Sequence, residues 1–201
     1  MKIAGGLDIG TTGCKIALYD ENVKHIETYY SEYDATYKGG QYEIDFEKIL
    51  LSVKGLLKKA TSKYEITTLG VTSFGESFVM LDENNNILAP ALLYTDPRGT
   101  DEVKLLSAKF GEEKLTFLTG VLPHSMYSIS KIFWHKKNTP DLFERCSKIL
   151  LGEDYIIYSL TGTRQISYSL AARTGAFDVE KKIWLNEFLA KNTSHFASKA
   201  N

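Results

Sequence analysis

The pattern of apolar and polar residues predicts that the chain begins with strands. Two short apolar runs, residues 3–9 and 15–19, flank a turn rich in glycine and threonine and predict a β-hairpin. Residues 23–30 follow a polar turn and predict a third strand of the same meander. Residues 31–41 show no period and contain Gly39-Gly40, which favours a loop.

An amphipathic helix is the clearest single element in the pattern. Apolar side chains recur at helical spacing between Phe46 and Ala60. Asp45 precedes the first of them and is a residue type that favours the N-cap position, while Lys58 and Lys59 suit the negative end of the helix dipole. This helix is expected to pack one apolar stripe against a core.

Four further strands are predicted, at residues 66–73, 78–81, 87–89 and 92–94. The first of these is largely apolar and is expected at the centre of its sheet. Strands that alternate with a crossover helix favour an α/β domain with a mixed sheet flanked by helices.

Beyond residue 100 the pattern is mainly helical. Helices are expected at residues 100–110 (capped by Thr100), 112–118, 128–136, from 139–140 onward, 153–160 and 184–190. A short strand is expected at 148–151, residues 166–174 are ambiguous, 176–179 predict a turn, and 192–201 are expected to fray.

Composition is that of an ordinary globular protein, with 201 residues, 43% apolar and 24% charged. The net charge of −1 gives no electrostatic attraction to nucleic acid or to an anionic membrane. No apolar run approaches the ~20 residues of a membrane-spanning helix, and the start lacks the long apolar core of a signal peptide. We therefore expect a cytoplasmic protein with no nucleic-acid or membrane partner, in which Cys14 and Cys146 are reduced thiols.

The turn of the opening hairpin carries the first candidate chemistry. Gly10 allows a tight bend whose N–H groups point at an anion, while Thr11, Thr12 and Lys15 add hydroxyls and a positive charge. Asp8 would repel a phosphate unless Mg²⁺ lies between them, held through water. The segment is not a Walker A loop, because the Gly-x-x-x-x-Gly-Lys-Ser/Thr spacing is missing. A hairpin turn with an incidental aspartate stays open as the alternative.

Two polar segments follow predicted strands, where open α/β sheets place their ligands. Gly75 leaves space for close approach, and the carboxylate of Glu76 suits the vicinal hydroxyls of a sugar or polyol. In the other segment, Tyr94 precedes Asp96 and Arg98, which offer an acceptor and a forked donor beside an aromatic face. Taken alone, the first segment also fits a solvated turn and the second a surface ion pair.

Two later segments are weaker candidates. His124 and Met126 lie in a polar and aromatic loop before a predicted helix, although a lone histidine is more often a surface residue than a ligand. Arg173 lies in a stretch of small residues and suits either a structural role or an anion, with the structural role preferred.

Laid side by side, these segments resemble the N-terminal part of the FGGY carbohydrate kinases, a family that includes xylulose, glycerol and gluconate kinases. The resemblance covers nearly the whole chain in the right order. The matching stretches are 7–12 with Lys15, 40–45, 70–76, 93–98, 118–120, 130–132, 160–162 and 167–174.

The resemblance implies a ribonuclease-H-like, actin-like ATPase domain that transfers the γ-phosphoryl group of ATP to a sugar or polyol, with Mg²⁺ as cofactor. Residues 1–201 would form an incomplete N-terminal domain, with the C-terminal kinase domain as a missing partner. Asp8 would hold the Mg²⁺ hydration shell, and Gly10, Thr11, Thr12 and Lys15 would approach the phosphates. The residues implied around the sugar are Gly75, Glu76, Asp96, Arg98, His124 and Met126.

The departures from the family pattern also carry expectations. The family's catalytic aspartate lies in a Gly-Asp-Gln segment that this sequence lacks, so no residue here is assigned as the base and the chain alone is expected to be inactive. Asp154 aligns with a helix start instead. Gly75 stands where glycerol kinases carry arginine, Met126 where they carry an aromatic residue, and Ser167 where aspartate is usual, which disfavours glycerol and leaves the sugar open.

Two other readings remain. A non-catalytic actin-like binding or regulatory module would share all of these segments. A relative of acetate kinase fits the opening turn but not the segment from Tyr94 to Arg98. The sequence leaves open whether the protein forms a homodimer.

Overall fold

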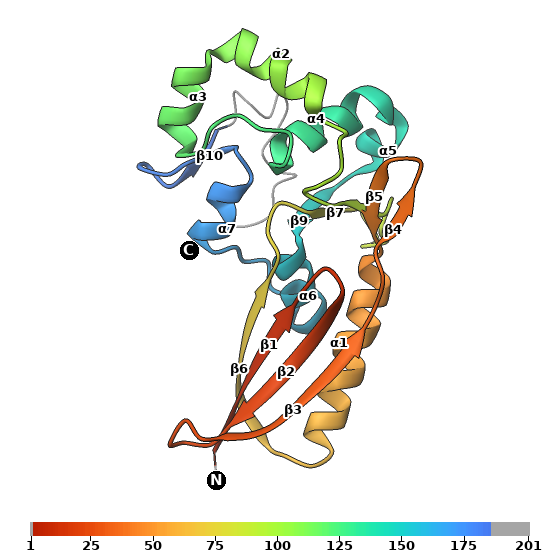
Figure 1. Ribbon diagram of the computed structural model, residues 1–201, viewed down its shortest axis with the longest axis vertical. Coiled ribbons are helices and arrows are strands. Elements are labelled where there is room, and N and C mark those ends of the chain that lie inside the picture. The colour runs from red at the N-terminus through yellow and green to blue at the C-terminus, as the bar shows by residue number, and fades with distance from the viewer. Residues whose placement is uncertain (1, 186–201) are drawn as a thin grey trace. The chain divides into compact units, whose positions relative to one another are not determined.

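The computed structural model describes residues 2–185, and these fall into two compact units (Figure 1). Unit 1 comprises residues 2–35 and 44–74, and unit 2 comprises residues 36–43 and 75–185. Each unit is described by itself.

Unit 1 is built on a four-stranded sheet in the order β3 (His25–Glu32), β2 (Gly13–Tyr19), β1 (Ile3–Ile9) and β6 (Ile66–Ser73). The first three strands form an antiparallel meander, and β6 pairs in parallel with β1. The predicted mixed sheet is confirmed. The central position expected for β6 is wrong, because among the described strands it lies at the edge and none of its eight residues is fully buried. Its polar residues are interspersed with Ile66, Leu69 and Val71, a composition typical of a half-exposed strand.

Helix α1 (Phe46–Thr61) confirms the helix predicted from the apolar stripe. Asp45 is its N-cap, and the Asp45 carboxylate accepts hydrogen bonds from the N–H groups of Glu47 (2.9 Å) and Lys48 (3.4 Å). The helix runs along β2 and β3 (Figure 1), so only one face of the sheet is covered by it. Its buried stripe consists of Phe46, Ile49, Val53, Leu56 and Ala60.

A hairpin in unit 2 replaces the loop that was expected at residues 31–41. Strands β4 (Thr36–Lys38) and β5 (Gln41–Ile44) pair across Gly39 and Gly40, whose φ angles are +61° and +81°. Two consecutive positive φ values are the hallmark of the type I′ turn, which suits glycine. The prediction failed because these strands are short and mostly exposed, and therefore lack an apolar alternation. Strand β8 (Ala91–Leu92) pairs with β5.

The buried strand pair of unit 2 is β7 (Phe78–Leu81) with β9 (Lys148–Leu151), which run antiparallel with Phe78 opposite Leu151. Both strands were predicted. The strand expected at residues 87–89 is wrong, because only a single bridge from Ile87 to Leu81 forms there.

The helices of unit 2 largely follow the prediction. They are α2 (Thr100–Phe110), α3 (Glu112–Thr119), α4 (Ser128–Asn138), α5 (Pro140–Arg145), α6 (Gly152–Thr161) and α7 (Tyr168–Arg173). The ambiguous stretch becomes α7, capped by the Ser167 hydroxyl. Thr100 is not the cap of α2: Gly99 occupies that position with φ +100°, and the Thr100 hydroxyl donates to the Pro97 carbonyl (2.6 Å).

The last described elements differ from the expected turn and helix. Strands β10 (Phe177–Asp178) and β11 (Ile183–Trp184) form a small hairpin in which Phe177 lies opposite Trp184. Their rings contact at 5.2 Å between centroids, and this aromatic pairing outweighs the helical pattern at Trp184. The rest of the helix expected at 184–190, and the tail at 192–201, lie outside the described residues.

Two apolar clusters form the interior of unit 2. One gathers around β7, β9 and α7, and includes Phe78, Ile149 and Leu170. The other lies between α2, α3 and α4, and includes Leu106, Leu115 and Ile129. Within residues 2–185, no helix has the length and apolar character needed to cross a bilayer.

Candidate functional site

The turn between β1 and β2, residues 10–13, is here called the phosphate turn. The Gly10 N–H donates to the Gly13 carbonyl (2.8 Å), which closes the turn. Buried Tyr33 fixes it from one side: its hydroxyl donates to the Gly10 carbonyl (2.7 Å) and its N–H donates to the Thr12 carbonyl (3.2 Å). The N–H groups of Thr11 and Thr12 find no acceptor within residues 2–185. The turn therefore presents open N–H donors, as an anion site requires.

Gly13 is required by packing. A Cβ built at this position would lie 2.3 Å from the Tyr30 hydroxyl and 2.8 Å from the Ser31 carbonyl oxygen, both closer than real contacts allow. We expect Gly13→Ala to lower the free energy of unfolding by about 1–3 kcal/mol, because the backbone at Ser31 has to move. Urea denaturation measures this. Gly6→Ala in β1 is the matched control, since nothing lies within 4 Å of its added Cβ. Equal stability of the two variants would contradict the expectation.

Asp8 and Lys15 lie opposite each other at the base of the phosphate turn, with the Lys15 Nζ 3.0 Å from the Asp8 Oδ2. Both side chains are about half exposed, so the pair contributes little to stability. Within the described residues, no group of three or more histidine, cysteine, aspartate or glutamate side chains could hold a metal ion. A single accessible carboxylate beside open N–H groups nevertheless fits Mg²⁺, which keeps several waters and binds through one or two protein carboxylates.

In unit 2, Glu76 lies at the centre of a three-residue turn from Gly75 to Ser77. The Ser77 N–H donates to the Gly75 carbonyl (2.7 Å), and Glu76 has φ +65°. A γ-turn with a positive central φ is rare and strained for a residue other than glycine. Gly75 itself is not forced by space, because a Cβ there would meet Arg173 and Leu170 only at ordinary contact distances of 3.7 Å.

Two residues distant in sequence hold Glu76. The buried hydroxyl of Ser128 donates to the Glu76 carbonyl (2.6 Å). The Nε and Nη2 atoms of Arg173 both donate to the Glu76 Oε1. The other carboxylate oxygen, Oε2, accepts no hydrogen bond from residues 2–185. Although Glu76 is only 4% exposed, it is thus left with one acceptor uncommitted.

The carboxylate of Asp96, which is 1% exposed, is fully engaged. Its Oδ1 accepts from the Arg98 N–H (2.9 Å) and Nε (2.8 Å), and its Oδ2 accepts from the Arg98 Nη2 (2.7 Å) and the Tyr42 N–H (2.6 Å). The Arg98 Nη1 lies 2.8 Å from the Glu43 Oε1, and the guanidinium lies over the Trp134 ring at 5.2 Å. Asp96 therefore anchors Arg98 and strand β5, and offers no open oxygen.

Opposing effects act on the pKa values of this ion pair. Burial alone would raise the pKa of Asp96, but hydrogen bonds from Arg98 and Tyr42 outweigh it, so the pKa lies below the ordinary value. Burial likewise works to lower the pKa of Arg98, and its bonds to Asp96 and Glu43 outweigh that and raise it. Both groups therefore remain charged across the physiological range.

Lys131 supports the same turn from the interior. Its side chain is fully buried, and the Nζ donates to the carbonyls of Asp96 (2.8 Å) and Arg98 (3.1 Å). Burial lowers the pKa of Lys131 to about 8, and it lowers the pKa of nearby His135 to about 4, so His135 is neutral at physiological pH. The Asp96–Arg98 turn is therefore held by two groups, the Asp96 carboxylate and the Lys131 ammonium.

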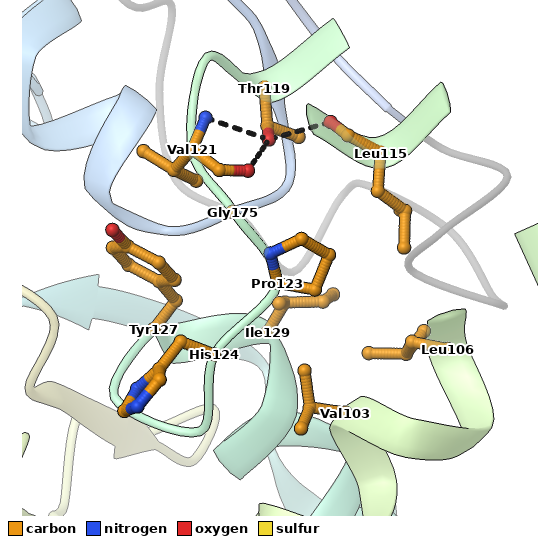
Figure 2. A pocket seen from close by; sticks show the side chains of 10 residues that line it. All are labelled: Val103, Leu106, Leu115, Thr119, Val121, Pro123, His124, Tyr127, Ile129 and Gly175. Atoms are coloured by element: carbon orange, nitrogen blue, oxygen red, sulfur yellow. Dashed lines mark hydrogen bonds between the residues drawn. The ribbon is translucent and has the colours of Figure 1, made fainter. Parts of the chain in front are cut away.

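His124 and Met126 lie in the loop before α4. The Met126 N–H donates to the exposed His124 Nδ1 (3.1 Å). Figure 2 shows His124 among the residues that line a small cavity, most of them apolar and contributed by α2, α3 and this loop. The Thr119 hydroxyl beside it is already bonded to the Leu115 and Val121 carbonyls. With mainly apolar walls, the cavity offers few partners for the hydroxyl groups of a sugar.

The structure divides the predicted site residues between the two units. Unit 1 contains Asp8, Gly10, Thr11, Thr12 and Lys15, and unit 2 contains Gly75, Glu76, Asp96, Arg98, His124 and Met126. Sequence reasoning gave no role to the residues that hold these groups in place, namely Tyr33, Glu43, Ser128 and Lys131, and preferred a structural role for Arg173. The segments 40–45 and 130–132 of the family resemblance were the available signal for Glu43 and Lys131.

Comparison with known proteins shows the family of the chain. Residues 3–193 match the model of the FGGY family of carbohydrate kinases, N-terminal domain. The chain is 31% identical over 189 residues to the xylulose kinase of Staphylococcus xylosus, covering 92% of this chain and 39% of that protein. It is 29% identical over 193 residues to the glycerol kinase of Thermococcus gammatolerans, covering 91% of this chain and again 39% of the relative. The chain thus spans about two fifths of the length of these relatives.

Solved structures agree in fold. The gluconate kinase of Lactobacillus acidophilus superposes with a TM-score of 0.91 at 26% identity, over 97% of this chain and 41% of that one. A ligand-bound xylulose kinase of the same organism gives a TM-score of 0.91 at 26% identity, over 98% and 41%. The predicted actin-like ATPase fold is therefore confirmed. The chain belongs to the FGGY family of carbohydrate kinases, and it matches the N-terminal domain of that family.

Proposed function

We propose that this chain is the sugar-binding, N-terminal lobe of an ATP-dependent kinase that phosphorylates a hydroxyl of a sugar or polyol, with a C-terminal kinase domain as its partner. The family assignment supports a carbohydrate kinase. Relatives named as xylulose, gluconate and glycerol kinases are similar to the chain to a comparable degree, so the proposed substrate is a sugar or polyol without further choice.

The observation that carries the proposal is the carboxylate of Glu76. A strained backbone is typical of functional sites, because the surrounding structure has to maintain it against its energetic cost. The Glu76 Oε1 is fixed by Arg173, whereas Oε2 is uncommitted within the described residues and suits a sugar hydroxyl. In this proposal Asp96 holds Arg98 in place and does not contact the sugar. The half-exposed Tyr94, two residues earlier in the sequence, offers an aromatic face to the sugar.

On the phosphate side, we propose that Gly10, Thr11, Thr12 and Lys15 receive the terminal phosphates of ATP. The open N–H groups of Thr11 and Thr12 support this assignment. Asp8 would hold the water shell of Mg²⁺, which when bound neutralises charge on the phosphates. The family's base segment, Gly-Asp-Gln, does not occur in this sequence, so we expect the 201 residues alone to bind sugar without turnover.

Titration of the ¹⁵N-labelled chain with ketoses, aldonates, hexoses and polyols tests the proposal by NMR. Saturable shifts are expected for the amides of residues 75–77 with at least one sugar. Glu76→Gln should weaken that binding at least tenfold, because the amide loses the negative charge and, with its oxygen on Arg173, places an NH2 donor where the Oε2 acceptor was. Glu113→Gln, an exposed glutamate on α3, is the control. Flat shifts with every sugar would contradict the proposal and favour a non-catalytic module.

A further inference from the structure

We propose that Arg173 and Ser128 are positioning residues of the sugar site: together they hold the Glu76 carboxylate in the one orientation that presents its Oε2 to a sugar hydroxyl. The identity of the ligand as a sugar rests on the proposed function. The positioning role rests on the geometry of residues 75–77, 128 and 173.

The turn at Glu76 does not maintain itself. A glutamate at φ +65° prefers a different backbone conformation, and the single Ser77-to-Gly75 hydrogen bond closes only a three-residue ring. Something outside the turn has to hold it, and the structure shows one contact to its backbone and one to its side chain.

Ser128 holds the backbone. It begins α4, is completely buried, and donates its hydroxyl hydrogen to the Glu76 carbonyl at 2.6 Å. The neighbouring Ile129 N–H donates to the Thr174 carbonyl (2.8 Å), which ties the start of α4 to the residue that follows α7. The support for Glu76 therefore comes from two helices whose ends are bonded to each other.

Arg173 holds the side chain. It is the last residue of α7, and its Nε and Nη2 both donate to the Glu76 Oε1, so rotation of the carboxylate is restricted and Oε2 is left without a hydrogen bond from the described residues. The guanidinium lies over the Tyr127 ring at 5.5 Å, which fixes its own plane. A lysine ammonium is a point charge without a fork and cannot reproduce this arrangement.

The Arg173→Lys variant separates positioning from simple stabilisation. The Arg173 side chain is 44% exposed but the Glu76 side chain is only 5% exposed, so removal of the arginine leaves a buried carboxylate without its partner and should lower both the urea midpoint and sugar binding. Lysine returns the positive charge without the fork. It should therefore restore the urea midpoint more fully than it restores sugar binding, whereas a purely structural role would restore both together.

The experiment measures sugar affinity, the urea midpoint and the hydrogen exchange of the Ser77 amide in the full chain. The variants are Arg173→Gln, Arg173→Lys and Ser128→Ala, with Arg145→Gln on α5 as the exposed arginine control. We expect Arg173→Gln to weaken sugar binding at least tenfold and to lower the urea midpoint, and Arg173→Lys to restore the midpoint but only part of the binding. Ser128→Ala should speed exchange of the Ser77 amide at least tenfold while amides in β1 stay unchanged.

The outcomes separate this inference from the function on which it rests. If the wild type binds sugar and Arg173→Gln binds it with the same affinity, the positioning role is wrong and the proposed function is unaffected. Absence of binding by the wild type would overturn the proposed function, and the Ser77 exchange rate then decides the inference. An unchanged rate in both Ser128→Ala and Arg173→Gln would refute it. If Ser128→Ala fails to fold, the half-exposed Arg173 variants give the answer alone.

Discussion

Replacement of Asp96 by alanine is expected to lower the free energy of unfolding by about 3–5 kcal/mol, the cost of breaking a buried ion pair by removing one partner. The loss would strip Arg98 of a forked acceptor and leave the Tyr42 N–H without its acceptor. Arg98 would keep only Glu43 as an anionic partner among the described residues. Asp96→Asn, which retains the shape but not the charge, should fall between alanine and wild type.

Urea denaturation followed by circular dichroism measures these changes. Asp101→Ala is the matched control, because Asp101 pairs with Lys104 at 3.0 Å on the surface, with both side chains more than 70% exposed. Its loss should leave the free energy of unfolding nearly unchanged, because both charges stay hydrated. If Asp96→Ala were as mild as Asp101→Ala, the Asp96 network would not be the anchor of the 96–98 turn, and a direct role of Asp96 with the sugar would regain support.

Replacement of Asp154 by asparagine is expected to have the opposite effect and to stabilise the chain near pH 8 by roughly 2–5 kcal/mol. Asp154 is buried at the start of α6, where its Oδ2 accepts from the Leu151 N–H (3.3 Å) and its Oδ1 has no partner. Burial raises the pKa of Asp154 from 3.8 to about 8, and the neighbouring charge of Glu153 adds to this. The buried side chain is therefore costly to ionise.

The raised pKa of Asp154 predicts how the free energy of unfolding changes with pH. Because the folded pKa lies above the unfolded one, the favourable contribution of Asp154 is complete below about pH 3.8 and is lost as the pH rises to about 8. The advantage of Asp154→Asn should accordingly be small at pH 4 and grow toward pH 8. Unfolding curves at several pH values for wild type, Asp154→Asn and the exposed control Asp141→Asn measure this. A constant difference across that range would show that Asp154 titrates normally.

Elements with local signals were predictable from the sequence. Helix α1 has an apolar stripe and a capping aspartate, and strands β7 and β9 are short, continuous apolar runs of the kind that become buried. The β4–β5 hairpin was missed because exposed strands carry no apolar alternation, although its Gly39-Gly40 turn was visible. The edge position of β6 depends on which strands pair with it, and pairing between distant segments leaves no local trace.

The same distinction applies to the site. Asp8, Glu76 and Arg98 stand in short polar segments at strand ends, so their residue types pointed to chemistry. The groups that hold them arrive from far away in sequence: Arg173 is 97 residues from Glu76, and Lys131 is 35 residues from Asp96. No periodicity or spacing in the sequence predicts contacts between such distant residues. Nor did the sequence indicate that Arg98 and Tyr42 together engage both oxygens of the Asp96 carboxylate, and a sugar contact of Asp96 stays a prediction.

The left-handed backbone at Glu76 has a consequence for how this protein responds to selection. Glycine or asparagine would occupy φ +65° at lower conformational cost than glutamate, so heat resistance and ligand capture favour different residues at this one position. A library screened only for survival at high temperature would drift toward glycine there and lose the acceptor. Directed evolution of this scaffold should therefore keep codon 76 fixed and seek its gains elsewhere.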